Sequence, residues 1–327
     1  MAGTNVAQPL DATFFAFRKR ERGGVLIGLT VVYAVAALVL FGGFVALHFN
    51  ALGAFLSWYA SIISATAAGD PNAAYGIAPP EGVGLLLGTM LPFLFLVYVL
   101  LAAYEAGCLR WMIRGESEGV MGLSLGADTW RVYSGYWVWF GLYLGYAIVA
   151  GVAMFAIIAG FALAAQSSPL LMIVGAVIGY ILYYGFMIYF AVRLAPAAAT
   201  SVGRRKFSFF QAWTVTRGRF WALFGAFLLA ILVFIAIEIV VIGVVGAALF
   251  TTLAPAFSGG GDPATAMQAL LTPQNMIVVG VAYLLLIVLS FIVYLMFFGI
   301  NARAVLAAAE EGKIEGVIGA QLARTFE

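Results

Sequence analysis

The chain has 327 residues, of which 65% are hydrophobic and only 9% are charged. Soluble domains contain about 45–50% apolar and roughly 25% charged residues, so this composition excludes a soluble enzyme, a nucleic-acid-binding domain and a disordered chain. The single Cys and single His also exclude an internal disulfide, a cysteine-based metal site and any site that needs two histidines. We therefore expect no catalytic residue, no metal, no bound cofactor and no nucleic-acid partner.

Six apolar stretches are long enough to cross a membrane, since a helix needs about 20 apolar residues to span roughly 30 Å of hydrocarbon. Backbone polar groups must be paired internally in lipid, so each stretch is expected to be helical. We predict an all-α polytopic protein that forms a single integral membrane domain over residues 1–327. The first stretch is longer than the apolar part of a signal peptide, about 7–15 residues, so we expect it to remain uncleaved. The predicted spans are Gly24–Phe49, Val83–Ile113, Gly135–Leu163, Leu170–Leu194, Trp221–Phe250 and Met276–Ile300.

The basic residues are distributed very unevenly around these spans. All 16 Lys and Arg residues lie in the N-terminal arm, the second-to-third connection, the fourth-to-fifth connection and the C-terminal tail. The other three connections contain none. The positive-inside rule then places both termini in the cytoplasm, which is consistent with an even number of spans. We therefore predict a multi-pass protein of the bacterial cytoplasmic (inner) membrane with residues 307–327 as a cytoplasmic tail.

The six spans group into three similar hairpins, over approximately residues 10–114, 121–196 and 207–306. A short stretch with apolar residues at helical spacing precedes each hairpin, and such stretches are expected to lie as interfacial helices in the plane of the membrane. Parallel repeats of this kind occur in transporters, although duplication of a hairpin without a transport role would produce the same pattern. The apolar positions are Leu10, Phe14 and Phe17 in the first stretch, Leu123, Ala127 and Trp130 in the second, and Phe209 and Trp213, after a potential N-cap at Ser208, in the third.

The basic side of the protein is a candidate surface for membrane lipids, because each well-placed Lys or Arg attracts anionic headgroups by about 1 kcal/mol. The alternative is that these charges only set the topology during insertion. Other membrane proteins are further candidate partners. The candidate headgroup residues are Arg18, Lys19, Arg20, Arg131, Arg204, Arg205, Lys206, Arg217 and Arg219.

Two acids fall within the predicted spans, where an ionisable side chain is expected to face the bundle and to be paired or protonated. Glu238 is surrounded by aliphatic residues and could be a proton or cation site, or a structural contact to His48, to a tyrosine or to the backbone. Glu105 lies nearer the basic side, and we expect Arg193 or Arg303 as its partner. Arg110 is five residues beyond Glu105 and faces elsewhere on the helix. Arg110, Arg193 and Arg303 each lie near the end of a returning helix.

Two motifs have simple interpretations. The string Gly122-Leu-Ser124-Leu-Gly126 matches the nucleophile elbow of hydrolases, but that motif needs a preceding strand and a histidine within reach. Because this string lies between membrane helices, we interpret it as a chance match. Three G-x-x-x-G pairs permit close helix contact, either within the bundle or between two copies. These pairs are Gly84/Gly88, Gly141/Gly145 and Gly175/Gly179.

The string Arg193-Leu-Ala-Pro196, followed by Phe209-Phe-Gln-Ala-Trp213-Thr-Val-Thr-Arg217-Gly-Arg-Phe-Trp221, resembles a family of uncharacterised bacterial inner-membrane proteins. These proteins are related to the YciC-type family and to the membrane domain found beside some glycerophosphoryl diester phosphodiesterases. The earlier string Gly122-Leu-Ser-Leu-Gly126-Ala-Asp128-Thr-Trp130-Arg131 is similar to the corresponding loop. The resemblance implies a six-helix membrane protein and carries no activity to this chain, which has no counterpart of the phosphodiesterase domain.

Three functions are compatible with these features. The first is a non-enzymatic membrane protein that binds or organises lipids or other membrane components. The second is a small transporter or permease that uses the parallel hairpins and Glu238. The third, which the lack of clustered catalytic groups disfavours, is a membrane-embedded enzyme.

Overall fold

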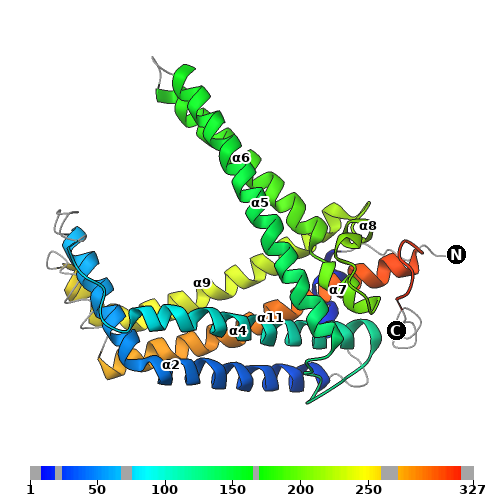
Figure 1. Cartoon of the computed structure of the whole chain (residues 1–327), viewed down its shortest axis with the longest axis horizontal. Helices are drawn as coiled ribbons and strands as arrows, with labels where there is room; N and C mark the ends of the chain where they lie inside the picture. Colours follow the sequence, from blue (N-terminus) through cyan, green and yellow to red (C-terminus); the bar gives the residue numbers. More distant parts are fainter. Residues whose placement is uncertain (1–8, 19–23, 68–75, 165–168, 259–271, 318–327) are drawn as a thin grey trace. The chain divides into compact units, whose positions relative to one another are not determined.

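The computed structural model describes residues 9–18, 24–67, 76–164, 169–258 and 272–317. Within them, six helices are long and apolar enough to cross a membrane (Figure 1). Each predicted span lies inside one of these helices, so the prediction of an all-helical protein with six candidate spans is confirmed. The helices are α2 (Gly24–Ala67), α4 (Val83–Arg114), α5 (Ala127–Ala164), α6 (Pro169–Leu194), α9 (Phe220–Ser258) and α11 (Pro273–Glu310).

Three of the long helices differ in where they bend or end. Helix α2 continues beyond the predicted span to Ala67, with a kink at His48, whose φ of −113° and ψ of 16° are not helical. Helix α4 continues through Pro92. In contrast, α6 ends at Leu194, and Pro196 then precedes a short helix, α7 (Ala197–Gly203). Proline thus terminates a helix here, as expected from its missing N–H group.

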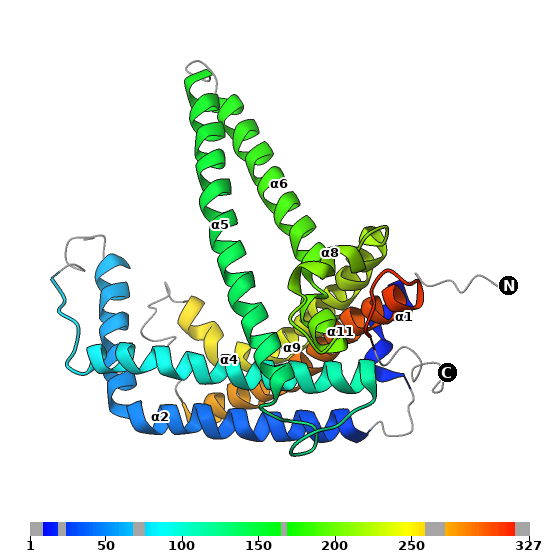
Figure 2. The same ribbon diagram turned by 45° about the vertical axis from the view of Figure 1, so that its right-hand side comes forward.

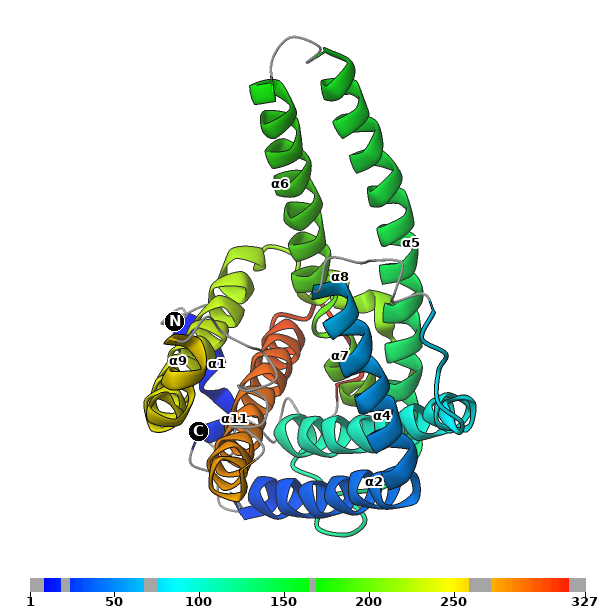
Figure 3. The same cartoon turned by 90° about the vertical axis from the view of Figure 1, so that its left-hand side faces the viewer.

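The chain divides into two compact units. The smaller unit comprises Arg22–Trp111 and Glu116–Trp137, and the larger comprises Met1–Glu21, Met112–Gly115 and Val138–Glu327. In the smaller unit, α2 and α4 run antiparallel, side by side (Figure 3). The Thr30 hydroxyl lies 3.0 Å from that of Tyr104, and the His48 ring nitrogen lies 3.0 Å from the Thr89 hydroxyl. These two pairs connect α2 and α4 at points far apart along both helices.

Helices α5 and α6 form an antiparallel hairpin (Figure 2), of which α6 and the part of α5 from Val138 onward belong to the larger unit. A Cβ atom on Gly175 would lie 2.4 Å from the Phe161 ring, and one on Gly179 would lie 3.6 Å from Met154. This G-x-x-x-G pair therefore supports close packing within one hairpin. A Cβ atom at any residue of the other two pairs, Gly84/Gly88 and Gly141/Gly145, would meet nothing within 4 Å.

Helices α9 and α11 form the third antiparallel pair and also belong to the larger unit. The rings of Phe227 and Phe297 lie 5.7 Å apart in this pair. The N-terminal arm packs on it: the Thr13 hydroxyl donates to the Ala226 carbonyl at 3.1 Å, and Phe15 and Ala16 are buried. The first segment of the described chain is therefore held by the last two helices.

The structure corrects the predicted interfacial helices. The described part of the arm, residues 9–18, contains α1 (Pro9–Thr13) and the 3-10 turn η1 (Phe15–Phe17), and Leu10, Phe14 and Phe17 are exposed. The stretch before the third span is helical only in part and is not a separate helix, because residues 115–126 form a loop and residues from Ala127 onward belong to α5 itself. The third stretch comprises η2 (Phe209–Gln211) and α8 (Ala212–Val215).

The third stretch also differs from the prediction in its packing. Phe209 is buried against Leu194, Ala197 and Ala212 and does not face outward. Ser208 occupies the N-cap position of η2, but its side chain makes no capping hydrogen bond. Apolar spacing alone therefore did not distinguish a face turned toward the protein from a face turned toward lipid.

Candidate functional sites at the basic ends of the helices

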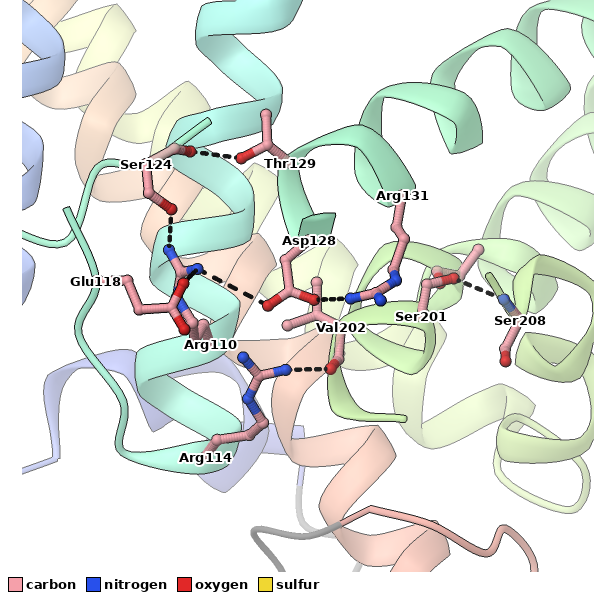
Figure 4. A network of polar contacts seen from close by, with 11 residues as sticks. Arg110, Arg114, Glu118, Ser124, Asp128, Thr129, Arg131, Ser201, Val202 and Ser208 are labelled. Carbon is pink, nitrogen blue, oxygen red and sulfur yellow. Dashed lines mark hydrogen bonds and ion pairs between the residues drawn. The ribbon is translucent and has the colours of Figure 1, made fainter. Parts of the chain in front are cut away.

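A buried ion-pair network lies where α4 ends. Arg110 is only 1% exposed. Its guanidinium donates to the Glu118 carboxylate at 2.6 Å and to the Ser124 hydroxyl at 3.0 Å, and lies 3.8 Å from the Asp128 carboxylate (Figure 4). A buried charge needs such partners, because removing it from water is costly. Arg110 thus joins the loop and the first turn of α5 to α4.

A tight turn brings the loop onto Arg110. Val120 and Leu123 exchange two backbone hydrogen bonds, each 3.0 Å long. Between them, Met121 and Gly122 have φ values of 50° and 100°, and two consecutive positive φ angles are typical of a type I′ turn. The Gly122 carbonyl then accepts a hydrogen bond from Arg110 at 3.2 Å.

A second glycine permits this approach from the α4 side. A Cβ atom on Gly107 would lie 2.8 Å from the carbonyl oxygen of Gly122 and 3.0 Å from the Leu29 side chain. Such distances are too short for a real Cβ atom, so the loop can reach the helix because Gly107 has none. Gly107, Gly122 and Arg110 together therefore allow the loop before α5 to pack against α4.

Ser124 of the hydrolase-like string is part of this arrangement. Its hydroxyl receives the hydrogen bond from Arg110, and its carbonyl accepts one from the Thr129 hydroxyl at 2.6 Å. The Ser124 hydroxyl is thus used in a structural contact that holds the loop.

Asp128 also pairs with Arg131, a predicted headgroup residue, at 2.5 Å (Figure 4). In the larger unit, the Arg114 guanidinium donates to the carbonyl of Val202 in α7 at 2.8 Å. Near it, the Ser208 N–H donates to the Ser201 hydroxyl at 3.1 Å. The basic side chains at the end of α4 and at the start of α5 are therefore engaged in contacts within the protein.

Arg193, at the end of α6, is held by aromatic rings and a carbonyl. Its Cζ atom lies 5.3 Å from the ring centroids of both Tyr189 and Trp213 and 5.8 Å from that of Phe220. These distances are within the range of cation–π attraction. Its guanidinium donates to the Thr216 carbonyl at 2.9 Å. Arg193 therefore fixes the segment that precedes α9.

Arg303, near the end of α11, lies 3.4 Å from the Glu310 carboxylate and 3.8 Å from that of Asp11 in α1. A Cβ atom on Gly299 would lie 2.8 Å from the Ala16 nitrogen, so this glycine permits the arm to approach the helix. Each of the three return arginines therefore contacts a segment that precedes a hairpin: Arg110 the one before α5, Arg193 the one before α9, and Arg303 the one before α2.

The ionisable side chains within the spans have other partners than we expected. Glu105 is 8% exposed and accepts a hydrogen bond of 2.5 Å from the Tyr136 hydroxyl, whereas we expected Arg193 or Arg303. His48 contacts Thr89. Glu238 is half-buried in α9 and has no hydrogen bond or ion pair to another described residue.

The nine predicted headgroup residues fall into three groups. Lys19 and Arg20 lie outside the described residues. Arg18 pairs with Asp11, Arg131 with Asp128, and Arg204 donates to the Glu315 carbonyl, while Arg219 pairs with Glu311 and donates to the Ala307 carbonyl. Three further residues are exposed and lie between α7 and α9, although Arg205 also has an interaction within the protein: Arg205, Lys206 and Arg217.

Glu311 follows the last residue of α11 and has a shifted pKa. Burial alone would raise the pKa of this carboxyl. Hydrogen bonds from Lys313 and Arg219, together with their positive charges, outweigh burial and hold the pKa below its usual range. The carboxylate therefore stabilises the folded state most when it is ionised.

The sequence did not indicate Glu118, Asp128 or Tyr136 as partners of Arg110 and Glu105. One general rule could have drawn attention to Asp128: acids are favoured in the first turn of a helix, and Asp128 lies in the first turn of α5. Among the described residues, no three or more His, Cys, Asp or Glu side chains gather in a group that could hold a metal ion.

We compared the chain with protein-family models, with curated proteins and with solved structures, and it matches none of them.

Proposed function

We propose that this chain is a non-enzymatic multi-pass protein of the bacterial cytoplasmic membrane, with both termini in the cytoplasm, and that it binds or organises anionic lipids or other membrane components. The observation that carries the proposal is the position of the charges relative to the six helices. The connections between α2 and α4, between α5 and α6, and between α9 and α11 contain no Lys or Arg. All basic residues therefore belong to the opposite ends of the helices, which is typical of a cytoplasmic face.

The surface of the helices supports a lipid environment. Large apolar side chains are exposed in every one of the six helices, and in water so much exposed apolar surface would favour aggregation. A hydrocarbon layer would cover it. One example from each helix, in chain order, is Leu38, Leu91, Phe155, Ile181, Ile239 and Leu284.

The topology can be tested with single cysteines, because the chain has one native cysteine, Cys108, which is buried. In a Cys108→Ala background, we expect a membrane-impermeant maleimide to label Ala78→Cys in cells whose cytoplasmic membrane is intact. Ser117→Cys should be labelled only after that membrane is opened. Labelling of Ser117→Cys from outside would contradict the proposed orientation.

The lipid-binding part of the proposal has a separate test. The full chain is extracted with its surrounding lipids, and the bound lipids are quantified by mass spectrometry against the lipids of the whole membrane. We expect enrichment of anionic phospholipids. A bound fraction with the same composition as the membrane would argue against this function.

A transporter is the second candidate, and Glu238 is the observation that favours it. An acid within a span that has no partner among the described residues is a candidate proton site. In vesicles that contain the full chain and a pH-sensitive dye, proton flux should be abolished by both Glu238→Gln and Glu238→Ala. Equal flux in wild type, both variants and empty vesicles would contradict this candidate.

A further inference from the structure

The loop between α4 and α5 carries exposed apolar side chains where it turns. Val120, Met121 and Leu125 are 67%, 63% and 65% exposed. A single exposed apolar residue is common on a protein surface, whereas a group of them marks contact with a membrane or with another molecule. We call these three residues the apolar tip.

The loop crosses the first turns of α2, as Figures 1 and 2 show. A Cβ atom on Gly28 would lie 3.5 Å from the sulfur of Met121, and one on Gly122 would lie 3.4 Å from the Leu29 side chain. Val31 follows Gly28 at the i+3 position, so the two are neighbours on the helix surface, and Val31 is 54% exposed. The apolar tip therefore continues the surface that α2 presents to lipid if this helix crosses the membrane.

The loop also folds back along α4 instead of extending beyond its end. The Gly122 carbonyl lies beside Gly107, where a Cβ atom would be 2.8 Å from its oxygen. Gly107 precedes Arg114, the last residue of α4, by seven residues, which is about 10 Å along a helix axis. The turn is therefore directed from the basic end of α4 toward its apolar part.

The backbone of the turn is paired within the protein. Val120 and Leu123 exchange two hydrogen bonds of 3.0 Å each, and the Gly122 carbonyl accepts one from Arg110 at 3.2 Å. Non-helical backbone is tolerated at membrane depth only where its polar groups have partners. These backbone groups therefore do not oppose contact of the turn with hydrocarbon.

The charges of the loop lie at its base. Glu118 and Asp128 both pair with Arg110, at 2.6 Å and 3.8 Å. Glu116 is half-buried and also has a contact within the protein. Residues 119–127 contain no charged side chain. The apolar tip can therefore enter an apolar phase without carrying a charge into it.

The backbone at Met121 supplies an independent argument. Its φ is 50°, and the first central position of a type I′ turn favours Asn, Asp or Gly. A bulky residue with a positive φ is an outlier, and such an outlier suggests that its side chain is used. Contact of the Met121 side chain with a membrane would be such a use.

We propose that the apolar tip inserts into the cytoplasmic leaflet of the membrane, at the boundary between phospholipid headgroups and acyl chains. Val120 and Met121 contact the acyl chains beside α2, while Glu118 and Arg110 stay at the level of the headgroups. Trp130, which is 45% exposed near the start of α5, favours the same boundary. This inference rests on the membrane location proposed above and names a loop that contacts the lipid.

The test uses the full chain in phosphatidylcholine nanodiscs, with an environment-sensitive fluorophore on single cysteines in a Cys108→Ala background. Two sets of nanodiscs carry a nitroxide on the acyl chains, close to the headgroup in one set and near the end of the chain in the other. The fluorophore at Met121→Cys should emit at a shorter wavelength than in water and be quenched mainly by the shallow nitroxide.

Two further positions are the controls. Ser117 is exposed in the same loop, between two acids, so the fluorophore at Ser117→Cys should emit as in water and keep its emission. Leu38 is 71% exposed within the first predicted span, so the fluorophore at Leu38→Cys should be quenched mainly by the deep nitroxide. Equal quenching at positions 117 and 121 would overturn the inference, because the whole loop would then lie at one depth.

A second pair of variants separates insertion from formation of the turn, and it keeps the test possible if Met121→Cys does not fold. Asn is favoured at the position of Met121, so the turn should persist in V120C/M121N although its apolar anchor is lost. The fluorophore at Val120→Cys should be quenched by the shallow nitroxide in the single variant and less in V120C/M121N. Equal quenching in the two variants would overturn the role of Met121.

The remaining outcomes separate this inference from the proposed membrane location. If the fluorophore at position 121 emits as in water while that at position 38 is quenched, the membrane location stands and the inference is overturned. If the fluorophore at position 121 emits at a shorter wavelength but is not quenched, protein covers the apolar tip, and the inference is also overturned. Absence of quenching at position 38 would overturn the membrane location itself.

Discussion

Arg110 shows how a single charged residue can organise a loop beside an apolar helix. Its three side-chain partners come from a short stretch of chain, and two of them are acids. Glu118 is 55% exposed, whereas Asp128 is 6% exposed. Asp128 is held between Arg110, at 3.8 Å, and Arg131, at 2.5 Å, so the buried charges of Arg110 and Asp128 are both compensated within this network.

Replacing Arg110 with Gln should therefore be strongly destabilising, by about 3 kcal/mol, which is typical of removing one member of a buried ion pair. Glu118→Gln should cost less, about 1 kcal/mol, because Glu118 is 55% exposed, Gln can still accept the hydrogen bond from Arg110, and the buried arginine keeps Asp128 as its counter-charge. Both can be measured as thermal unfolding midpoints in the same detergent. Equal midpoints for the two variants would contradict the importance of burial.

Gly107 provides a second test at the residue scale. Gly107→Ala places a Cβ atom 2.8 Å from the Gly122 carbonyl, so the loop must shift, at a cost of about 1–3 kcal/mol. Gly84 lies in the same helix with nothing within 4 Å, so Gly84→Ala should be neutral or slightly stabilising through helix propensity. Unfolding midpoints of the two variants check the contrast, which a similar loss in both would refute.

At the scale of elements, the described helices follow closely from the sequence. Long apolar runs predict membrane-length helices because backbone groups must be paired within each run. The contacts at the helix ends were harder to predict from the sequence. Arg110 meets Glu118 and Ser124 across a turn formed by Met121 and Gly122, and helical spacing does not extend across a turn.

The same limit explains why the stretch before the third span is helical only in part. Leu123, Ala127 and Trp130 have helical spacing, but the first of them lies in a loop and the other two in α5. The partner of Glu105 also differs from the one we expected, for a related reason. An arginine was the obvious choice from charge alone, whereas Tyr136 satisfies the carboxyl through a hydrogen bond.

The N-terminal arm should detach when its docking glycine is lost. A side chain on Gly299 would collide with the Ala16 backbone, so Gly299→Leu should displace α1 and η1 from α11. Hydrogen–deuterium exchange of the peptide that covers residues 9–17 should then become faster. Gly280→Leu in the same helix, where a Cβ atom has nothing within 4 Å, is the matched control and should leave the exchange rate unchanged.

The end of α11 should contribute a pH-dependent stability. The pKa of Glu311 is lowered in the folded state, so its contribution is present above the unfolded pKa, about 4.3, and is lost as the pH falls through the folded pKa. Wild type should therefore unfold at a higher temperature than Glu311→Gln at pH 7, and the difference should shrink below about pH 4. Because Glu311 is 37% exposed, solvent screening keeps the difference small. A difference that grows on acidification would contradict the assignment.

At the scale of the whole molecule, the arginines at the ends of the three hairpins, Arg110, Arg193 and Arg303, follow one pattern. Each of them contacts the segment of chain that leads into a hairpin. The first hairpin's arginine holds the segment before the second, the second hairpin's arginine holds the segment before the third, and Arg303 of the third holds the arm before the first. Three related hairpins would produce this order if each leading segment packs on the hairpin preceding it. The last contact closes the order by bringing α1 against α11.

This closure can be tested in native membranes. In a Cys108→Ala background, the double variant D11C/R303C should be cross-linked within one chain by a short bis-maleimide, because the two native side chains approach to 3.8 Å. The product should migrate as a monomer and, after cleavage of the chain between the two cysteines, as two fragments held together. Each single variant controls for cross-links between chains. If the double variant gives only intermolecular products, or none, the N-terminal arm does not dock on the last hairpin in the membrane.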